Sequence, residues 1–132
     1  MTTPSVEARI EHVNITVTDP KATAEVLKRL FGWEIRWQGE AKDNGFTVHV
    51  GSDSHYLALY TPAKPLTGPA ERYIKRGALN HVGLVVSDIA AAETAVRDAG
   101  YEPHSHAEYE PGKRFYFDGD DGVEYELVSY TN

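Results

Sequence analysis

The chain has 132 residues, no cysteine, and 13 lysine and arginine residues against 20 aspartate and glutamate residues, for a formal net charge of −7. This length suits one compact domain with a single hydrophobic core. Because no basic stripe is available to neutralise phosphates, we expect neither nucleic acid nor an anionic membrane as a partner. The lack of cysteine excludes disulfides, thiolate zinc sites and thiol nucleophiles. No segment predicts a signal peptide or a membrane helix, so a cytoplasmic protein is expected.

The first half of the chain predicts a strand, a helix and three further strands. Residues 10–18 alternate between apolar and polar side chains, which is typical of a strand with one buried face. Asp19 and Pro20 then form a helix start, and Gly32 ends the apolar helical repeat. Turn-forming sequences separate the three further strands, which are expected at 33–39, 46–51 and 56–60.

The second half predicts the same order of elements. A strand at 79–86 precedes a helix that begins after Asp88 and ends at Gly100. Three strands follow near 101–106, 114–117 and 123–130. "AEVLKRLFGWE" at 24–34 and "AETAVRDAGYE" at 92–102 share five residues in register, which indicates an internal repeat.

Two histidines and a carboxylate occupy matching places in this repeat. His12 and His81 open corresponding strands, and neutral imidazole is a common ligand of divalent metals. In the last strand, Glu124 and Glu126 fall on the polar face. Glu124 lies nearer the turn, and we interpret it as a solvated carboxylate. Two histidines and one carboxylate leave up to three metal positions for substrate, oxygen or water.

The segments "IEHVNITVTDP", "LNHVGLVVSDI" and "YFDGDDGVEYELV" resemble the vicinal oxygen chelate superfamily, which contains glyoxalase I, bleomycin and fosfomycin resistance proteins and extradiol dioxygenases. The resemblance implies eight strands that line a cup, with metal ligands on the first and last strand of each module. His12, His81 and Glu126 match three of the four ligand places. The fourth place corresponds to Leu57 or Ala58, and neither side chain binds a metal. The remaining set is similar to the His-His-Glu site of fosfomycin resistance enzymes and extradiol dioxygenases.

We therefore predict an α+β fold of two βαβββ modules whose strands form an eight-stranded, open, cup-shaped sheet with the helices outside. The chain is expected to be one domain, 1–132, with module one at 9–61, a linker at 62–77 and module two at 78–130. Each module has one apolar sheet face that needs cover and strand edges that need partners. The resemblance and these edges also predict a homodimer.

Two functions are open at this point. The first is a metal-dependent lyase, dioxygenase or transferase in which His12, His81 and Glu126 hold one divalent ion per chain, with Mn(II), Fe(II), Ni(II) and Zn(II) all suitable. Glu126 is also a candidate catalytic group, and His55 is a candidate substitute ligand or acid/base group. The second is a metal-free protein that sequesters a small aromatic or hydrophobic molecule, as the resemblance to bleomycin resistance proteins implies.

Other polar and aromatic residues give weaker signals. His104 and His106 fall on one face of a predicted strand, which we interpret as an exposed edge strand. Arg114 is one of several cations that an anionic substrate could meet, although an ordinary surface charge is expected. The aromatic residues that could line an apolar cup are Trp33, Trp37, Phe46, Tyr56, Tyr60, Phe115 and Tyr116.

Overall fold

The computed structural model describes residues 9–68, 70–109 and 112–130. The chain divides into two compact units, Met1–Lys64 and Pro65–Asn132, and each unit is described by itself. This division falls inside the predicted linker, while the exact module boundaries stay a prediction. Within the described ranges, no helix is long and apolar enough to cross a membrane.

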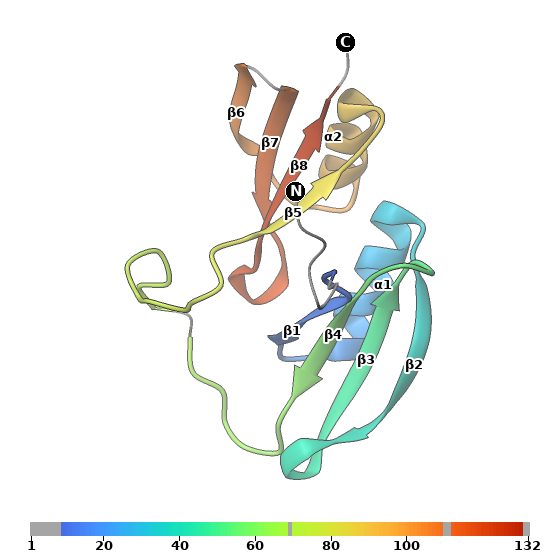
Figure 1. Ribbon diagram of the computed structural model, residues 1–132, viewed down its shortest axis with the longest axis vertical. Coiled ribbons are helices and arrows are strands. Elements are labelled where there is room, and N and C mark those ends of the chain that lie inside the picture. The colour runs from blue at the N-terminus through green and yellow to red at the C-terminus, as the bar shows by residue number, and fades with distance from the viewer. Residues whose placement is uncertain (1–8, 69, 110–111, 131–132) are drawn as a thin grey trace, which may run out of the picture. The chain divides into compact units, whose positions relative to one another are not determined.

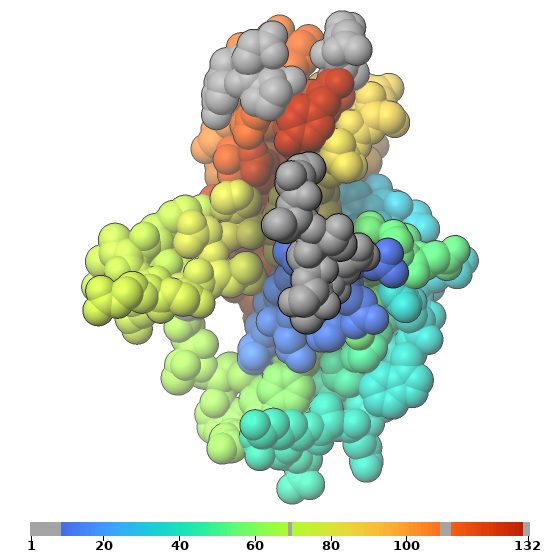
Figure 2. Space-filling model, viewed as in Figure 1, coloured from blue at the N-terminus to red at the C-terminus, as the bar shows by residue number. Residues whose placement is uncertain are grey.

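The first unit contains one helix and four strands in the order βαβββ (Figure 1). The elements are β1 (His12–Thr16), α1 (Pro20–Phe31), β2 (Glu34–Ala41), β3 (Gly45–Gly51) and β4 (Tyr56–Thr61). The sheet order is β1-β4-β3-β2, with β1 parallel to β4 and the other neighbours antiparallel. A short turn at Lys42–Asn44 joins β2 to β3, and its teal atoms lie at the surface in Figure 2.

The second unit repeats this architecture. Its elements are β5 (Val82–Val85), α2 (Ile89–Asp98), β6 (His104–Tyr109), β7 (Gly112–Asp118) and β8 (Glu124–Ser129). The sheet order is β5-β8-β7-β6, and again only the first and last strands of the unit pair in parallel. The predicted fold class of two βαβββ modules is confirmed, with the eight strands divided between two four-stranded mixed sheets.

Equivalent residues begin the two helices. Asp19 Oδ1 accepts a hydrogen bond from the Ala22 amide at 3.1 Å, and Asp88 Oδ1 accepts one from the Ala91 amide at 3.0 Å. These caps satisfy amide donors that have no partner inside the helix. Gly32 ends α1 in the left-handed region at φ 68°, where a side chain is disfavoured. The sequence predicted both helix starts because capping is a local interaction.

Each helix packs on one face of its own sheet, and the core of each unit lies between them. Alternate strand residues point into this layer, and burial of each large side chain contributes about 1.5–3 kcal/mol. The fully buried apolar members are Val17, Leu27, Val48, Val50 and Leu59 in the first unit, and Val96, Phe115, Phe117 and Leu127 in the second. The opposite face of each sheet is called the open face below, and it carries the histidine, acidic and aromatic side chains discussed in the next subsection.

Candidate functional site

His81 and Glu126 lie together on the open face of the second unit. His81 directly precedes β5, and Glu126 lies on β8 opposite Gly83. His81 Nε2 is 3.2 Å from Glu126 Oε1, and the two side chains are 32% and 12% exposed. The Glu126 carboxylate lies beside Gly83, where a Cβ would meet Glu126 Oε1 at 3.7 Å, an ordinary van der Waals contact. A nitrogen donor and an oxygen donor are therefore held side by side.

Arg114 on β7 holds the other oxygen of Glu126. Its Nη1 donates a hydrogen bond to Glu126 Oε2 at 2.8 Å, and the two side chains are only 15% and 12% exposed. A charged hydrogen bond between two mostly buried side chains restricts rotation of the Glu126 carboxylate. The sequence predicted an ordinary surface charge at Arg114, and this was wrong. The partner of Arg114 is on the neighbouring strand, and the spacing of residues along the chain does not indicate which residue stands there.

His12, the first residue of β1, lies on the open face of the first unit. Its Nδ1 is 2.8 Å from Glu11 Oε1, and its ring stacks on Tyr56 with the centroids 4.8 Å apart. The hydrogen bond with His12 holds the pKa of the Glu11 carboxyl below its ordinary value. When Nδ1 donates to this carboxylate, Nε2 presents its lone pair to a ligand. The role of His12 as a metal ligand stays a prediction.

Strand register identifies the residue of the first unit that corresponds to Glu126. Gly83 pairs with Glu126 between β5 and β8, and its repeat equivalent Asn14 pairs with Ala58 between β1 and β4. Ala58, and not Leu57, therefore occupies the fourth ligand place. Its side chain is a methyl group at 2% exposure, so it offers no donor atom there.

His55 lies just before β4 and is exposed. Its ring meets Trp33 edge-on, with the centroids 5.8 Å apart. Alternation along the strand groups His55 with Leu57, which faces the helix, and not with Ala58 on the open face. The structure brings the His55 ring against an aromatic residue. A catalytic role for His55 stays a prediction.

Four rings form a continuous row across the open face of the first sheet. His12, Tyr56, His49 and Trp37 come from β1, β4, β3 and β2, and successive centroids are 4.8, 4.6 and 5.3 Å apart. The Arg36 guanidinium lies 4.5 Å from the Tyr56 centroid. Burial lowers the pKa of His49, and the charges of His12 and Arg36 lower it further, which favours a neutral ring. Because the rings of His12, Tyr56 and His49 stack face to face, a further planar ring can stack only at an end of this aromatic row, where Trp37 is exposed.

The contact between Arg114 and Glu126 generates a test of stability. Replacing Arg114 by Met removes the charged partner of a mostly buried carboxylate, and we expect the free energy of unfolding to fall by about 3 kcal/mol. Denaturant unfolding of Arg114→Met, Glu126→Gln and the double variant should give a coupling energy of about 1–3 kcal/mol. Lys113→Met is the control, because its exposed ion pair with Glu108 should contribute less than about 1 kcal/mol. A coupling energy near zero would contradict this account of the pair.

Comparisons with known proteins agree with the fold. A family model described as the Glyoxalase/Bleomycin resistance protein/Dioxygenase superfamily matches residues 11–117. A search of curated proteins finds no match to the chain. Among solved structures, a glyoxylase/bleomycin resistance protein/dioxygenase domain from Frankia sp. EAN1pec has a TM-score of 0.80 at 17% identity, covering 96% of this chain and 100% of that chain.

The fosfomycin resistance protein FosX from Listeria monocytogenes is also similar, with a TM-score of 0.74 at 15% identity and 96% of each chain covered. A second crystal structure of that Listeria protein, complexed with Mn(II) and a sulfate ion, has a TM-score of 0.71 at 15% identity and covers 96% of this chain and 95% of that chain. At these identities the structural likeness shows the fold alone. Together with the family pattern across residues 11–117, it shows that the chain belongs to the Glyoxalase/Bleomycin resistance protein/Dioxygenase superfamily.

Proposed function

We propose that the chain is a divalent-metal-dependent enzyme that acts on a small molecule, with His12, His81 and Glu126 as the metal ligands. The observation that carries the proposal is the 3.2 Å separation of His81 Nε2 and Glu126 Oε1. Two ligand atoms about 2.1 Å from one ion and at right angles to each other are about 3.0 Å apart. The pair therefore fits a common ion with little movement of either side chain.

The donor set also fits a metal in its chemistry. Two imidazole nitrogens and one carboxylate oxygen suit Mn(II), Fe(II), Ni(II) or Zn(II). The Listeria FosX structure with Mn(II) supports a metal in a protein of this fold. When bound, such an ion polarises oxygens of a substrate or lowers the pKa of a bound water. The reaction would then be of the lyase, dioxygenase or transferase type.

Two neighbouring residues position these ligands in the proposal. Glu11 Oε1 accepts a hydrogen bond from His12 Nδ1–H and so leaves Nε2 for the ligand bond. Arg114 holds Glu126 Oε2, so Glu126 presents Oε1 beside His81 and would bind through one oxygen. In this proposal Glu126 is a catalytic residue because it binds the metal ion. Glu11 and Arg114 are positioning residues.

Metal analysis of reconstituted protein tests the proposal. We expect His12→Ala, His81→Ala and Glu126→Gln each to lose one tightly bound equivalent of Mn(II) per chain that the unaltered protein holds. Loss of one ligand should weaken binding by at least about tenfold. Elemental analysis after dialysis, together with Mn(II) titration followed by electron paramagnetic resonance, measures both quantities.

His106→Ala is the matched control, since His106 pairs with Glu93 of α2 on the helix side of its sheet and should not affect the ion. His55→Ala tests whether His55 is a substitute ligand, because removing its ring lowers the Mn(II) content only if His55 binds the ion. Equal Mn(II) content in the unaltered protein and in the three triad variants would rule out the triad.

The aromatic row supports a second candidate function, which is the binding of a planar aromatic molecule without a metal. Trp37 is 52% exposed at one end of the row, so a ligand can stack on it. We expect Trp37→Ala to weaken binding of such a ligand by about tenfold, since one aromatic contact contributes about 0.5–1.5 kcal/mol. Isothermal calorimetry with a set of planar aromatic compounds in chelator measures this, with Trp33→Phe as the control. Aromatic binding that vanishes in chelator or in His81→Ala would favour the enzyme instead.

We also propose a homodimer. Each sheet ends in two edge strands, β1 and β2 in the first unit and β5 and β6 in the second. Edge strands expose unpaired backbone groups that a second copy can cover. Sedimentation equilibrium is expected to give twice the chain mass of 14.7 kDa at tens of micromolar, an order of magnitude suited to weak dimers. A single 14.7 kDa species would contradict it.

A further inference from the structure

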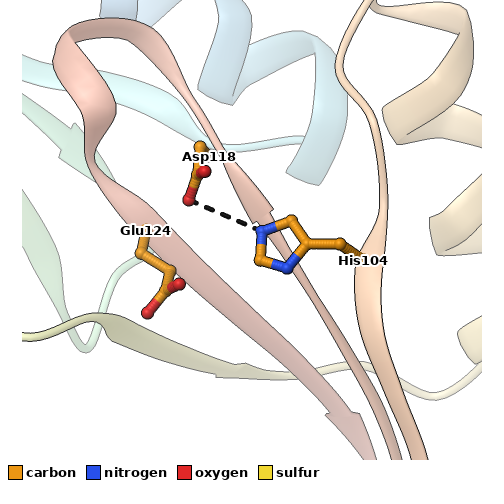
Figure 3. Close-up of side chains that lie close together, drawn as sticks. All are labelled: His104, Asp118 and Glu124. Atoms are coloured by element: carbon orange, nitrogen blue, oxygen red, sulfur yellow. Dashed lines mark ion pairs between the residues drawn. The ribbon is translucent and has the colours of Figure 1, made fainter.

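We propose that the second unit contains another divalent cation site, formed by His104 on β6, Asp118 on β7 and Glu124 on β8. Each residue offers one ligand atom, and these atoms all lie within 4.8 Å of one another. Figure 3 shows the imidazole of His104 and the carboxylate of Asp118 turned toward each other, with Glu124 on the neighbouring strand. These three residues, the His104 cluster, share no ligand with the proposed triad.

A bulge in β6 places His104 on the open face. The pairing of β6 with β7 shifts register directly after His104, so His104 and His106 point to opposite faces. His104 stacks on Tyr116, whereas His106 stacks on Phe115 and pairs with Glu93 of α2. The sequence predicted both imidazoles on one face, and this was wrong because strict alternation assumes a strand without a bulge.

The ring of His104 is oriented as a ligand. Its Nδ1 is 2.8 Å from the Ser105 hydroxyl oxygen, and its Nε2 is 3.5 Å from Asp118 Oδ1. The Nε2 atom is buried and has no hydrogen-bond partner among the residues that the structure describes. Two ligands about 2.1 Å from a tetrahedral ion stand about 3.4 Å apart. The 3.5 Å between His104 Nε2 and Asp118 Oδ1 is long for a hydrogen bond but suits two ligands of one ion.

The two carboxylates are in a position that a cation would stabilise. Asp118 and Glu124 are direct partners in the antiparallel pairing of β7 with β8, where like charges repel. Glu124 Oε1 is buried and lacks a hydrogen-bond partner within the described segments. The sequence predicted a solvated Glu124, and the burial of this oxygen corrects that interpretation. A buried, unpartnered carboxylate oxygen on a residue paired with a second acidic residue is costly unless positive charge offsets it.

The donor set indicates the class of ion. One imidazole nitrogen with two carboxylate oxygens suits Zn(II), Mn(II), Co(II) or Ni(II), whereas Ca(II) and Mg(II) prefer oxygen ligands alone. The side chains of His104 and Asp118 are 38% and 56% exposed, so water can reach the ion and complete its coordination. An ion there would link the three strands β6, β7 and β8.

Zn(II) titration of the full chain tests the site. In a His81→Ala/Glu126→Gln background, we expect isothermal calorimetry to detect one Zn(II) per chain and the melting temperature to rise on binding. His104→Gln, Asp118→Asn and Glu124→Gln should each weaken this binding at least about tenfold and abolish the rise. His106→Gln is the matched control and should keep both. The three cluster substitutions, made one at a time in the unaltered chain, should each remove one of two Zn(II) equivalents. This second measurement keeps the test valid if the His81→Ala/Glu126→Gln variant folds poorly.

Melting in chelator separates loss of the site from loss of the fold. Asp118→Asn and Glu124→Gln remove the carboxylate repulsion, so we expect them to melt no lower than their parent when no metal is present. Zn(II) binding that His104→Gln, Asp118→Asn and Glu124→Gln leave unchanged, or no Zn(II) binding in either background, would overturn the proposal. The proposed triad fails separately, if His81→Ala/Glu126→Gln leaves the number of bound ions unchanged while the substitutions in the His104 cluster still reduce it.

Discussion

The alternation of β8 between core and open face is the constraint on which the candidate sites depend. Tyr125 and Leu127 are buried in the layer beneath α2, and burial raises the pKa of the Tyr125 phenol above its ordinary value. Because successive side chains of a strand point to opposite faces, burial of these two residues places Glu124 and Glu126 on the open face. A shift of one residue in register would bury the carboxylates and expose the core. Hydrophobic burial therefore determines where the oxygen donors lie.

Strand β7 organises the donors on that face. Arg114 holds Glu126, and Asp118 stands opposite Glu124, so the two carboxylates of β8 have different partners on the same neighbouring strand. Tyr116 lies between these positions, and its ring contacts His81 edge-on at 5.6 Å and stacks on His104 at 6.3 Å. A single aromatic side chain therefore contacts one histidine from each candidate site. The two sites belong to one polar face but differ in their charge balance, since only the Glu126 site includes an arginine.

The two units share a backbone plan but carry different chemistry on their open faces. By strand register, Tyr56 and Ala58 of the first unit stand where the second unit has Glu124 and Glu126. The first unit also carries the aromatic row, with Arg36 over Tyr56. The open-face positions lie outside the layer between sheet and helix, so their side chains can differ between the units while that layer keeps its packing. The histidines at the start of β1 and before β5 are retained in both units.

The sequence by itself determined the family, the two βαβββ modules and the helix caps. Hydrophobic periodicity, capping residues and an internal repeat are local signals, and the elements they predicted are present with ends shifted by a few residues. The sequence also predicted that His81 and Glu126 belong to one site, although their role as ligands stays a prediction. Tertiary structure alone decided the partner of Arg114, the choice of Ala58 over Leu57, the bulge that separates His104 from His106, and the burial of Glu124 Oε1. Each of these depends on which residues stand opposite one another on neighbouring strands, and register is set by packing across the whole sheet and not by the residues adjacent in the chain.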